Sequence, residues 1–285
     1  MHKKNFFMVG MPGSGKTAYI GSTWIMLVDG EVETKYKKLP DNMPEDYGRL
    51  DEIAQNILEY NDLERTKEGE SIKLELPLSD ERGNEIYLDI PDLAGEIFRD
   101  LVKDRRISKV IVKKLLEADC ILFFTFYKNM SLERRIQLSE NDAIQKEKKN
   151  EIQNVDINKS REANESEVVE LLQLILELLK KEKKLVDIKF IMSAWDVVEE
   201  EYGIDILPEQ FTQQKFPLLY QCIKSNQDQI RPEFWGISAI GGDLNNPEEV
   251  KRLQKEEINA IKVVMPDGRK SNDLTALLAE IGDEK

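Results

Sequence analysis

Eight residues near the start of the chain have the types and spacing that can hold a chain of phosphates. Gly10-Met11-Pro12-Gly13-Ser14-Gly15-Lys16-Thr17 matches G-x-x-x-x-G-K-[ST] at every fixed position. The glycines let the backbone approach phosphate oxygens closely, and successive N–H groups supply the positive ends of dipoles. We expect Lys16 to reach the β- and γ-phosphates and the Thr17 hydroxyl to bind Mg²⁺. Because Ala18 continues into a helix, the motif predicts a nucleoside triphosphate site.

A second motif follows the apolar stretch at 85–90. The chain continues there as Pro91-Asp92-Leu93-Ala94-Gly95-Glu96, in which Asp92 and Gly95 have D-x-x-G spacing. At this point the sequence resembles the small Ras-like P-loop GTPases, in the class related to translation factors. The resemblance implies that Asp92 holds Mg²⁺ through water and that the Gly95 N–H contacts the γ-phosphate. Asp89, earlier in the same stretch, is the competing magnesium carboxylate.

Glu96 stands where the family carries the Gln that orients the attacking water. A carboxylate accepts a hydrogen bond from water, but it also lies near the phosphate charges. Two outcomes stay open: Glu96 supports slow hydrolysis as a base or water holder, or the protein is mainly a nucleotide-dependent switch. Phosphoryl transfer also needs a cation for the developing charge. The candidates are an arginine from a partner or the arginines just beyond the motif, Arg99, Arg105 and Arg106.

A third motif comes after the apolar stretch 185–192, where the family carries N-K-x-D. The chain reads Ser193-Ala194-Trp195-Asp196. Asp196 matches the family's Asp, which accepts from guanine N1–H and the N2 amine. Ser193 and Ala194 replace the Asn and the Lys, which weakens the case for guanine. Trp195 either covers the base by stacking or packs into the edge of the sheet.

Two further positions complete the resemblance. Ser238-Ala239 follows an apolar stretch and is similar to the family's S-A-x loop, whose backbone contacts guanine O6. Thr66 precedes the second motif and suits the family's second Mg²⁺-binding threonine, with Thr34 as the alternative. The implied cofactors are GTP or GDP and Mg²⁺.

These motifs need a scaffold of alternating strands and helices. Apolar stretches predict strands at 6–9, 72–78, 85–90, 120–127, 185–192 and 234–237, with a hairpin joining 72–78 to 85–90. Helical patterns occupy 18–28, 97–117, 166–184, 205–230 and 271–281. We therefore expect an α/β, three-layer P-loop NTPase fold. It would have a mostly parallel sheet, one antiparallel hairpin strand and helices on both faces. We expect one domain over 1–285, with a charged insertion at about 128–165.

Composition limits the partners. The 285 residues include 41 basic and 55 acidic side chains, for a net charge of −14. This balance disfavours nucleic acid, which needs a basic face, and favours a protein partner or effector. No apolar stretch is long enough to span a membrane, the N-terminus is too short for a signal peptide, and the two distant cysteines indicate a cytoplasmic protein.

Three functions remain open on these grounds. The first is a GTP-hydrolysing switch, the second a non-hydrolysing nucleotide-binding scaffold, and the third a P-loop ATPase or small-molecule kinase. The sequence is also similar to the double-GTPase domains of bacterial conflict systems, which implies gating of an effector. With one phosphate loop in this chain, the second GTPase copy would lie on another chain.

Overall fold

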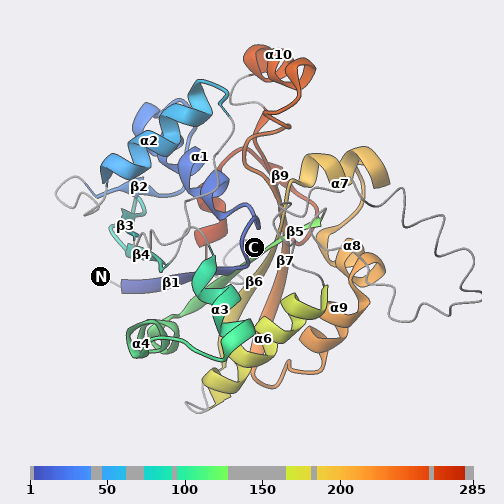
Figure 1. The fold of residues 1–285 in the computed structure, drawn as a ribbon. Helices are drawn as coiled ribbons and strands as arrows, with labels where there is room; N and C mark the ends of the chain where they lie inside the picture. Colours follow the sequence, from blue (N-terminus) through green and yellow to red (C-terminus); the bar gives the residue numbers. More distant parts are fainter. Residues whose placement is uncertain are drawn as a thin grey trace, which may run out of the picture.

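The computed structural model describes residues 3–39, 47–61, 74–91, 95–127, 165–180, 185–256 and 260–279. Those residues form a nine-stranded sheet in the order β2-β3-β4-β1-β5-β6-β7-β8-β9. Its centre is five parallel strands: β4 (Glu85–Ile90), β1 (Lys3–Gly10), β5 (Cys120–Phe126), β6 (Val186–Ser193) and β7 (Ile230–Ser238). The expected mostly parallel α/β architecture is therefore confirmed (Figure 1).

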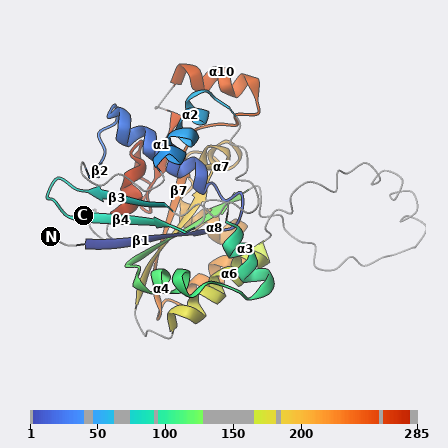
Figure 2. The same cartoon turned by 60° about the vertical axis from the view of Figure 1, so that its left-hand side comes forward.

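Helices cover both faces, because alternate side chains of each buried strand point to opposite sides. Phe7 and Val9 face one core, and Phe6 and Met8 face the other. The second core lies under α1 (Lys16–Asp29), α2 (Tyr47–Leu58) and a short 3₁₀ helix, η5 (Leu274–Leu278). The first lies under α3 (Glu96–Asp104), α4 (Lys109–Glu117), α6 (Glu165–Leu179), α7 (Trp195–Tyr202), α8 (Pro208–Lys215) and α9 (Pro217–Lys224). The two layers are separated by the sheet in the turned view (Figure 2).

The predicted hairpin is confirmed, but the edges of the sheet hold more than the sequence indicated. β3 (Leu74–Ser79) pairs antiparallel with β4, as expected. Three further short strands extend the sheet: β2 (Lys37–Lys38), β8 (Lys262–Val264) and β9 (Lys270–Ser271). Two- and three-residue strands carry too little periodicity to be predicted from sequence.

Two predicted helices are each divided in two. The 97–117 helix breaks at Arg105, whose left-handed φ of 57° ends α3, and Ser108 then caps α4 by accepting from the Ile111 N–H. The 205–230 helix breaks at Phe216, because Pro217 cannot continue α8 and instead begins α9. The predicted helix at 271–281 is only η5, capped by Asp273 instead of Ser or Asn.

The charged insertion expected at about 128–165 falls outside the described residues, except for Glu165, which begins α6. Within the part of the chain that the structure describes, no helix combines the length and apolar character needed to cross a membrane.

Candidate nucleotide site

The phosphate loop occupies the carboxyl end of β1 and leads directly into α1. Gly13 and Gly15 have φ of 73° and 90°, a left-handed backbone that favours glycine. Gly15 is the residue before the helix and offers no side-chain cap, so the first N–H groups of α1 face the loop without a capping side chain. A loop of this form presents backbone donors and the positive end of a helix dipole to an anion.

Lys16 is buried and folded onto the loop that contains it. Its Nζ donates to the Gly10 carbonyl at 2.8 Å, to the Met11 carbonyl at 2.9 Å and to the Ser14 Oγ at 3.2 Å. Only 2% of the residue is exposed. The ammonium group therefore lies within the curve of the loop, where an entering phosphate can take over from the neutral carbonyls.

Gly95 places the second motif against the first. It has a left-handed φ of 79° and directly precedes α3. A Cβ at Gly95 would lie 2.7 Å from the Met11 carbonyl carbon and the Pro12 nitrogen, and 2.8 Å from the Gly10 oxygen. Gly95 thus lies against the backbone of the phosphate loop, and the contact of its N–H with the γ-phosphate stays a prediction. Asp92 lies outside the described residues.

Ser193 fastens the third motif to the phosphate loop. Its hydroxyl lies 2.9 Å from the Ser14 carbonyl and 2.9 Å from the Thr125 carbonyl. One hydroxyl proton serves one carbonyl at a time, so the serine alternates between the loop and β5 or shares its proton. Although Ser193 departs from the family's Asn, it joins the base-side motif to the phosphate side.

Asp196 is held at the start of α7 with its carboxylate bonded to the Ser238 hydroxyl, which donates to Oδ1. The helix is in turn fixed one turn later, where the buried Glu199 carboxylate pairs with Lys262 of β8 and with Lys270 of β9, the latter at 2.9 Å. Two motifs separated by 42 residues thus meet through one hydrogen bond.

One cavity of about 460 Å³ joins these elements. The predicted residues that line it are Gly13, Gly15, Ala18, Asp196, Ser238 and Ala239. Sequence reasoning missed Phe126, Val197 and the loop from Ile240 to Asn245, which also line it. The Gly241-Gly242 pair that follows the S-A dipeptide is the signal that could have drawn attention to this loop.

Trp195 is a core residue, which corrects its assignment as a nucleotide contact. Its side chain is fully buried, stands edge-on to Phe211 with ring centroids 5.5 Å apart, and does not line the cavity. A Cβ at Gly236 would lie 2.3 Å from the indole, so the ring lies directly over that glycine. Of the two alternatives for Trp195, packing against the sheet is the one that the structure supports.

Two alternatives for magnesium ligands are also contradicted. Asp89 faces α4 and pairs with Lys114 at 2.5 Å, on the side of the sheet away from α1. Thr34 comes shortly before β2, at the far end of the sheet from the phosphate loop. Lys37 of β2 pairs with Ser79, Ser79 pairs with Glu85, and Glu85 pairs with Lys3 at the start of β1. Seven residues of strand separate Lys3 from Gly10, about 23 Å at 3.3 Å per residue. Thr66 lies outside the described residues.

The remaining donor set suits a hard cation that also binds phosphate. Among the described residues no three His, Cys, Asp or Glu side chains gather as a metal cluster. Mg²⁺ is commonly held by one or two protein oxygens together with phosphate oxygens and water. The Thr17 hydroxyl, directly after Lys16, is one oxygen of this kind, and Asp92, the expected carboxylate, stays a prediction because it lies outside the described residues.

Glu96 is the first residue of α3 and pairs with Arg99 of the same helix at 3.3 Å. Arg105, another candidate cation, pairs with Glu170 of α6 and not with the phosphate loop. Glu96, which we expect to act in hydrolysis, is therefore bound to an arginine of its own helix, directly after Gly95.

Known proteins give the following picture. The profile of the Double-GTPase 1 family matches residues 7–281, whereas no curated protein matches the chain by sequence. Among solved structures, bacterial selenocysteine-specific elongation factor EF-Sec is 12% identical over 92% of this chain and 29% of that one, with a TM-score of 0.38. The GTP-bound Ski7 GTPase-like domain of S. cerevisiae is 11% identical over 87% and 45%, with a TM-score of 0.40. The chain thus spans less than half the length of either, and at these TM-scores neither likeness bears on function. The family match covers nearly the whole chain, and the chain belongs to the Double-GTPase 1 family as a GTP-binding domain.

Proposed function

We propose that this protein is a cytoplasmic, Mg²⁺-dependent GTP switch, one domain that hydrolyses GTP slowly to GDP and phosphate and regulates a protein partner. The observation that carries the proposal is the cavity that runs from Gly13 and Gly15 of the phosphate loop to the Asp196–Ser238 pair. One end of the cavity is lined by the loop backbone, directly before the buried Lys16, and suits phosphates; the other end carries a carboxylate for a base.

The carboxylate end suits guanine. An ionised carboxylate only accepts hydrogen bonds, and guanine offers two adjacent donors, N1–H and the N2 amine. Ser238 donates to Oδ1 of Asp196 and fixes the orientation of the carboxylate, which leaves acceptor capacity on both oxygens. Adenine lacks that pair of donors, so the same geometry disfavours ATP.

The phosphate end suits a triphosphate in a chain of charge −14. Backbone N–H groups, Lys16 and a magnesium ion on Thr17 and Asp92 neutralise the ligand locally. The ion would supply positive charge for the transferred phosphoryl group. Lys16 exchanges its carbonyl partners for phosphate oxygens, and Gly95 lies against the loop, where its N–H would meet the γ-phosphate.

A non-hydrolysing scaffold is the second candidate, and one observation favours it. Glu96 is paired with Arg99, so its carboxylate is engaged before any water is held. That ion pair is partly exposed and therefore weak, which lets Glu96 release the arginine when a triphosphate attracts it. Hydrolysis is expected to be slow because Glu96 must change partners.

Base recognition is tested by Asp196→Asn. The variant should lose GTP affinity by ~100-fold or more, because one hydrogen bond loses its charged acceptor and the other is replaced by an amide donor facing a guanine donor. It should gain affinity for xanthosine triphosphate, which offers an acceptor at that position. Asp243→Asn is the matched control, because Asp243 lines the same cavity but caps the Asn245 N–H. Titration with GTP, ATP and xanthosine triphosphate gives the comparison. An unchanged base preference in Asp196→Asn refutes the assignment.

Hydrolysis is tested by phosphate release from wild type, Glu96→Ala and Glu96→Gln. We expect Glu96→Ala to be slower, and Glu96→Gln to be faster because it removes a negative charge beside the phosphates. Lys16→Ala should bind no triphosphate and sets the baseline. Wild-type turnover equal to that baseline, with GTP bound, establishes the scaffold instead. Normal binding by Lys16→Ala contradicts the phosphate site itself.

A further inference from the structure

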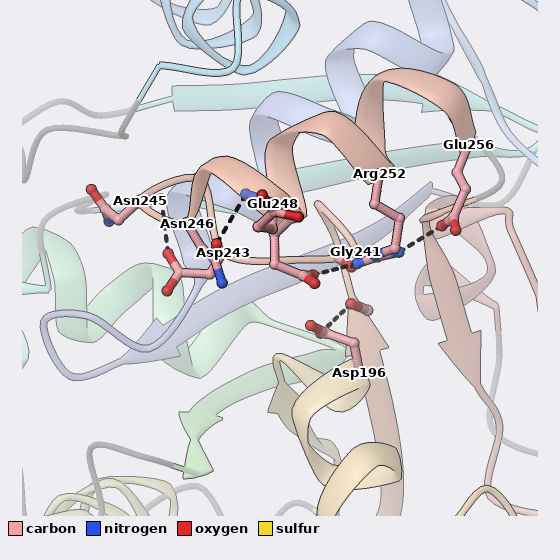
Figure 3. Close-up of polar contacts among 10 residues, drawn as sticks. Asp196, Gly241, Asp243, Asn245, Asn246, Glu248, Arg252 and Glu256 are labelled. Carbon is pink, nitrogen blue, oxygen red and sulfur yellow. Dashed lines mark hydrogen bonds and ion pairs between the residues drawn. The ribbon is translucent and has the colours of Figure 1, made fainter.

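The wall of the cavity beyond Ser238 is a glycine loop backed by a helix. The loop runs from Ala239 to Asn245, and α10 (Pro247–Glu256) follows it and passes back over it (Figure 3). Residues up to Asn245 line the cavity, and none of the described residues of α10 does. The loop therefore lies between the helix and the cavity.

Arg252 of α10 binds this loop directly. Its Nη2 donates to the Gly241 carbonyl at 2.6 Å and to Glu249 Oε2 at 2.6 Å, and its Nη1 donates to Glu256 Oε2 at 2.6 Å (Figure 3). The two carboxylates hold the guanidinium flat along the helix. Hydrogen bonding to Glu249 raises the pKa of Arg252 above its ordinary value, so the group stays charged throughout the neutral range.

The two glycines fit closely around this contact. Gly241 has a φ of 91°, and a Cβ there would lie 2.5 Å from the Ala260 Cβ and oxygen. A Cβ at Gly242 would lie 2.8 Å from Glu249 Oε2 and 2.9 Å from Arg252 Nη2. The loop is therefore held between Arg252 on one side and Ala260 on another, and a side chain at Gly241 would clash with the Ala260 backbone.

Because the peptide bond is planar, the contact of Arg252 with the Gly241 carbonyl also sets the direction of the Gly242 N–H at the cavity. In a trans peptide the C=O of one residue and the N–H of the next point in opposite directions. Since Arg252 holds the Gly241 carbonyl toward α10, the Gly242 N–H points away from the helix. Gly242 lines the cavity, so a backbone donor is presented on the wall that continues from Ser238 and Asp196.

We propose that Arg252 is a positioning residue for base recognition: by holding the Gly241 carbonyl it aims the loop backbone at the acceptor edge of the bound base. The inference rests on the proposed function, because it concerns the base end of that same site. Arg252 does not touch the ligand. Its loss frees the Gly241–Gly242 peptide to rotate, which weakens binding of the base and leaves binding of the phosphates unaltered.

The experiment compares Arg252→Ala and Arg252→Lys with two controls. Affinities for GTP, ATP and inorganic tripolyphosphate are measured by titration calorimetry, with thermal unfolding of each variant. Arg252→Ala should lose GTP affinity by up to ~10-fold, the value of one neutral backbone hydrogen bond to the base, and keep its tripolyphosphate affinity within twofold. Arg252→Lys should recover part of the loss, because an ammonium group can still reach the carbonyl.

The controls separate the contact with Gly241 from general effects. Glu256→Gln removes the charge of one partner of Arg252 but keeps the Nη2 bond, so its GTP-to-tripolyphosphate ratio should equal that of wild type. Arg231→Ala removes an arginine whose Nε is paired with Asp187, near the opposite end of β7, and should change nothing in the site. If Arg252→Ala fails to fold, the ratio in Arg252→Lys decides the matter.

Each result has one meaning. A fall in GTP affinity without a fall in tripolyphosphate affinity supports the role of Arg252. An equal loss for both ligands, or no loss, overturns it. A wild-type protein that binds ATP as tightly as GTP refutes the proposed guanine specificity, while the ratio of nucleotide to tripolyphosphate still tests Arg252.

Discussion

Gly95→Ala is the change that most directly tests the contact between the second motif and the phosphate loop. Alanine at a left-handed φ of 79° costs roughly 1–2 kcal/mol. The added Cβ would also lie 2.7 Å from two backbone atoms of the loop, Met11 C and Pro12 N, which cannot rotate away as a side chain could. Overpacking of this kind adds about 1–3 kcal/mol. The expected loss in the free energy of unfolding is therefore about 2–5 kcal/mol.

Two other glycines supply matched controls. Gly30 and Gly83 have φ of 68° and 76°, and a Cβ at either meets nothing within 4 Å. Gly30→Ala and Gly83→Ala should therefore show the conformational cost alone, roughly 1–2 kcal/mol, in urea denaturation. If α3 shifts aside in Gly95→Ala instead of straining, the stability matches the controls but GTP binding falls. A variant that matches the controls in stability and keeps wild-type GTP affinity refutes the proposed close contact.

Two further predictions concern buried polar groups. Ser193→Ala should destabilise the protein by about 1–3 kcal/mol in the same assay, because the Ser14 and Thr125 carbonyls lose a shared donor. The control Ser225→Ala, at an exposed serine, should change the stability little. Equal losses in the two variants would contradict the bridging role of Ser193. Burial raises the pKa of the Cys120 thiol to about 12, so at pH 8 iodoacetamide should modify only Cys222 in the native state and both thiols after denaturation, as read by mass spectrometry. Modification of native Cys120 at pH 8 would contradict its burial. Because the unfolded chain loses the Cys120 proton near pH ~8.5 and the native state keeps it, the free energy of unfolding should decline as pH rises above ~9.

The central strands and the motifs could be predicted from sequence because each rests on a local pattern. The run from Glu85 to Ile90 was predicted to the residue, and continuous apolar stretches marked the other parallel strands. The phosphate loop needed only its glycines and Lys16. The carboxyl ends of parallel strands meet at one edge of a sheet, so these motifs could also be expected to converge there.

What could not be predicted depends on contacts between distant parts of the chain. The side of the sheet that Trp195 faces is set by its packing against Gly236 and Phe211, and neither follows from the N-K-x-D pattern. The break at Arg105 is a single left-handed residue in an otherwise helical pattern. Arg252 reaches Gly241 only because α10 folds back over the loop, which no local periodicity encodes.

The short helix α3 has a mechanical consequence. It is bounded at both ends by left-handed residues, Gly95 and Arg105, which lie about 15 Å apart at 1.5 Å per residue. Its buried side chains, Phe98 and Leu101, join the core that α6 also lines, and α3 packs directly against α6. A rotation of ~10° at Gly95 would carry Arg105 through ~2.6 Å. Because this packing couples the two helices, a displacement that begins at Gly95, beside the phosphate loop, would also shift α6, the helix that begins at Glu165.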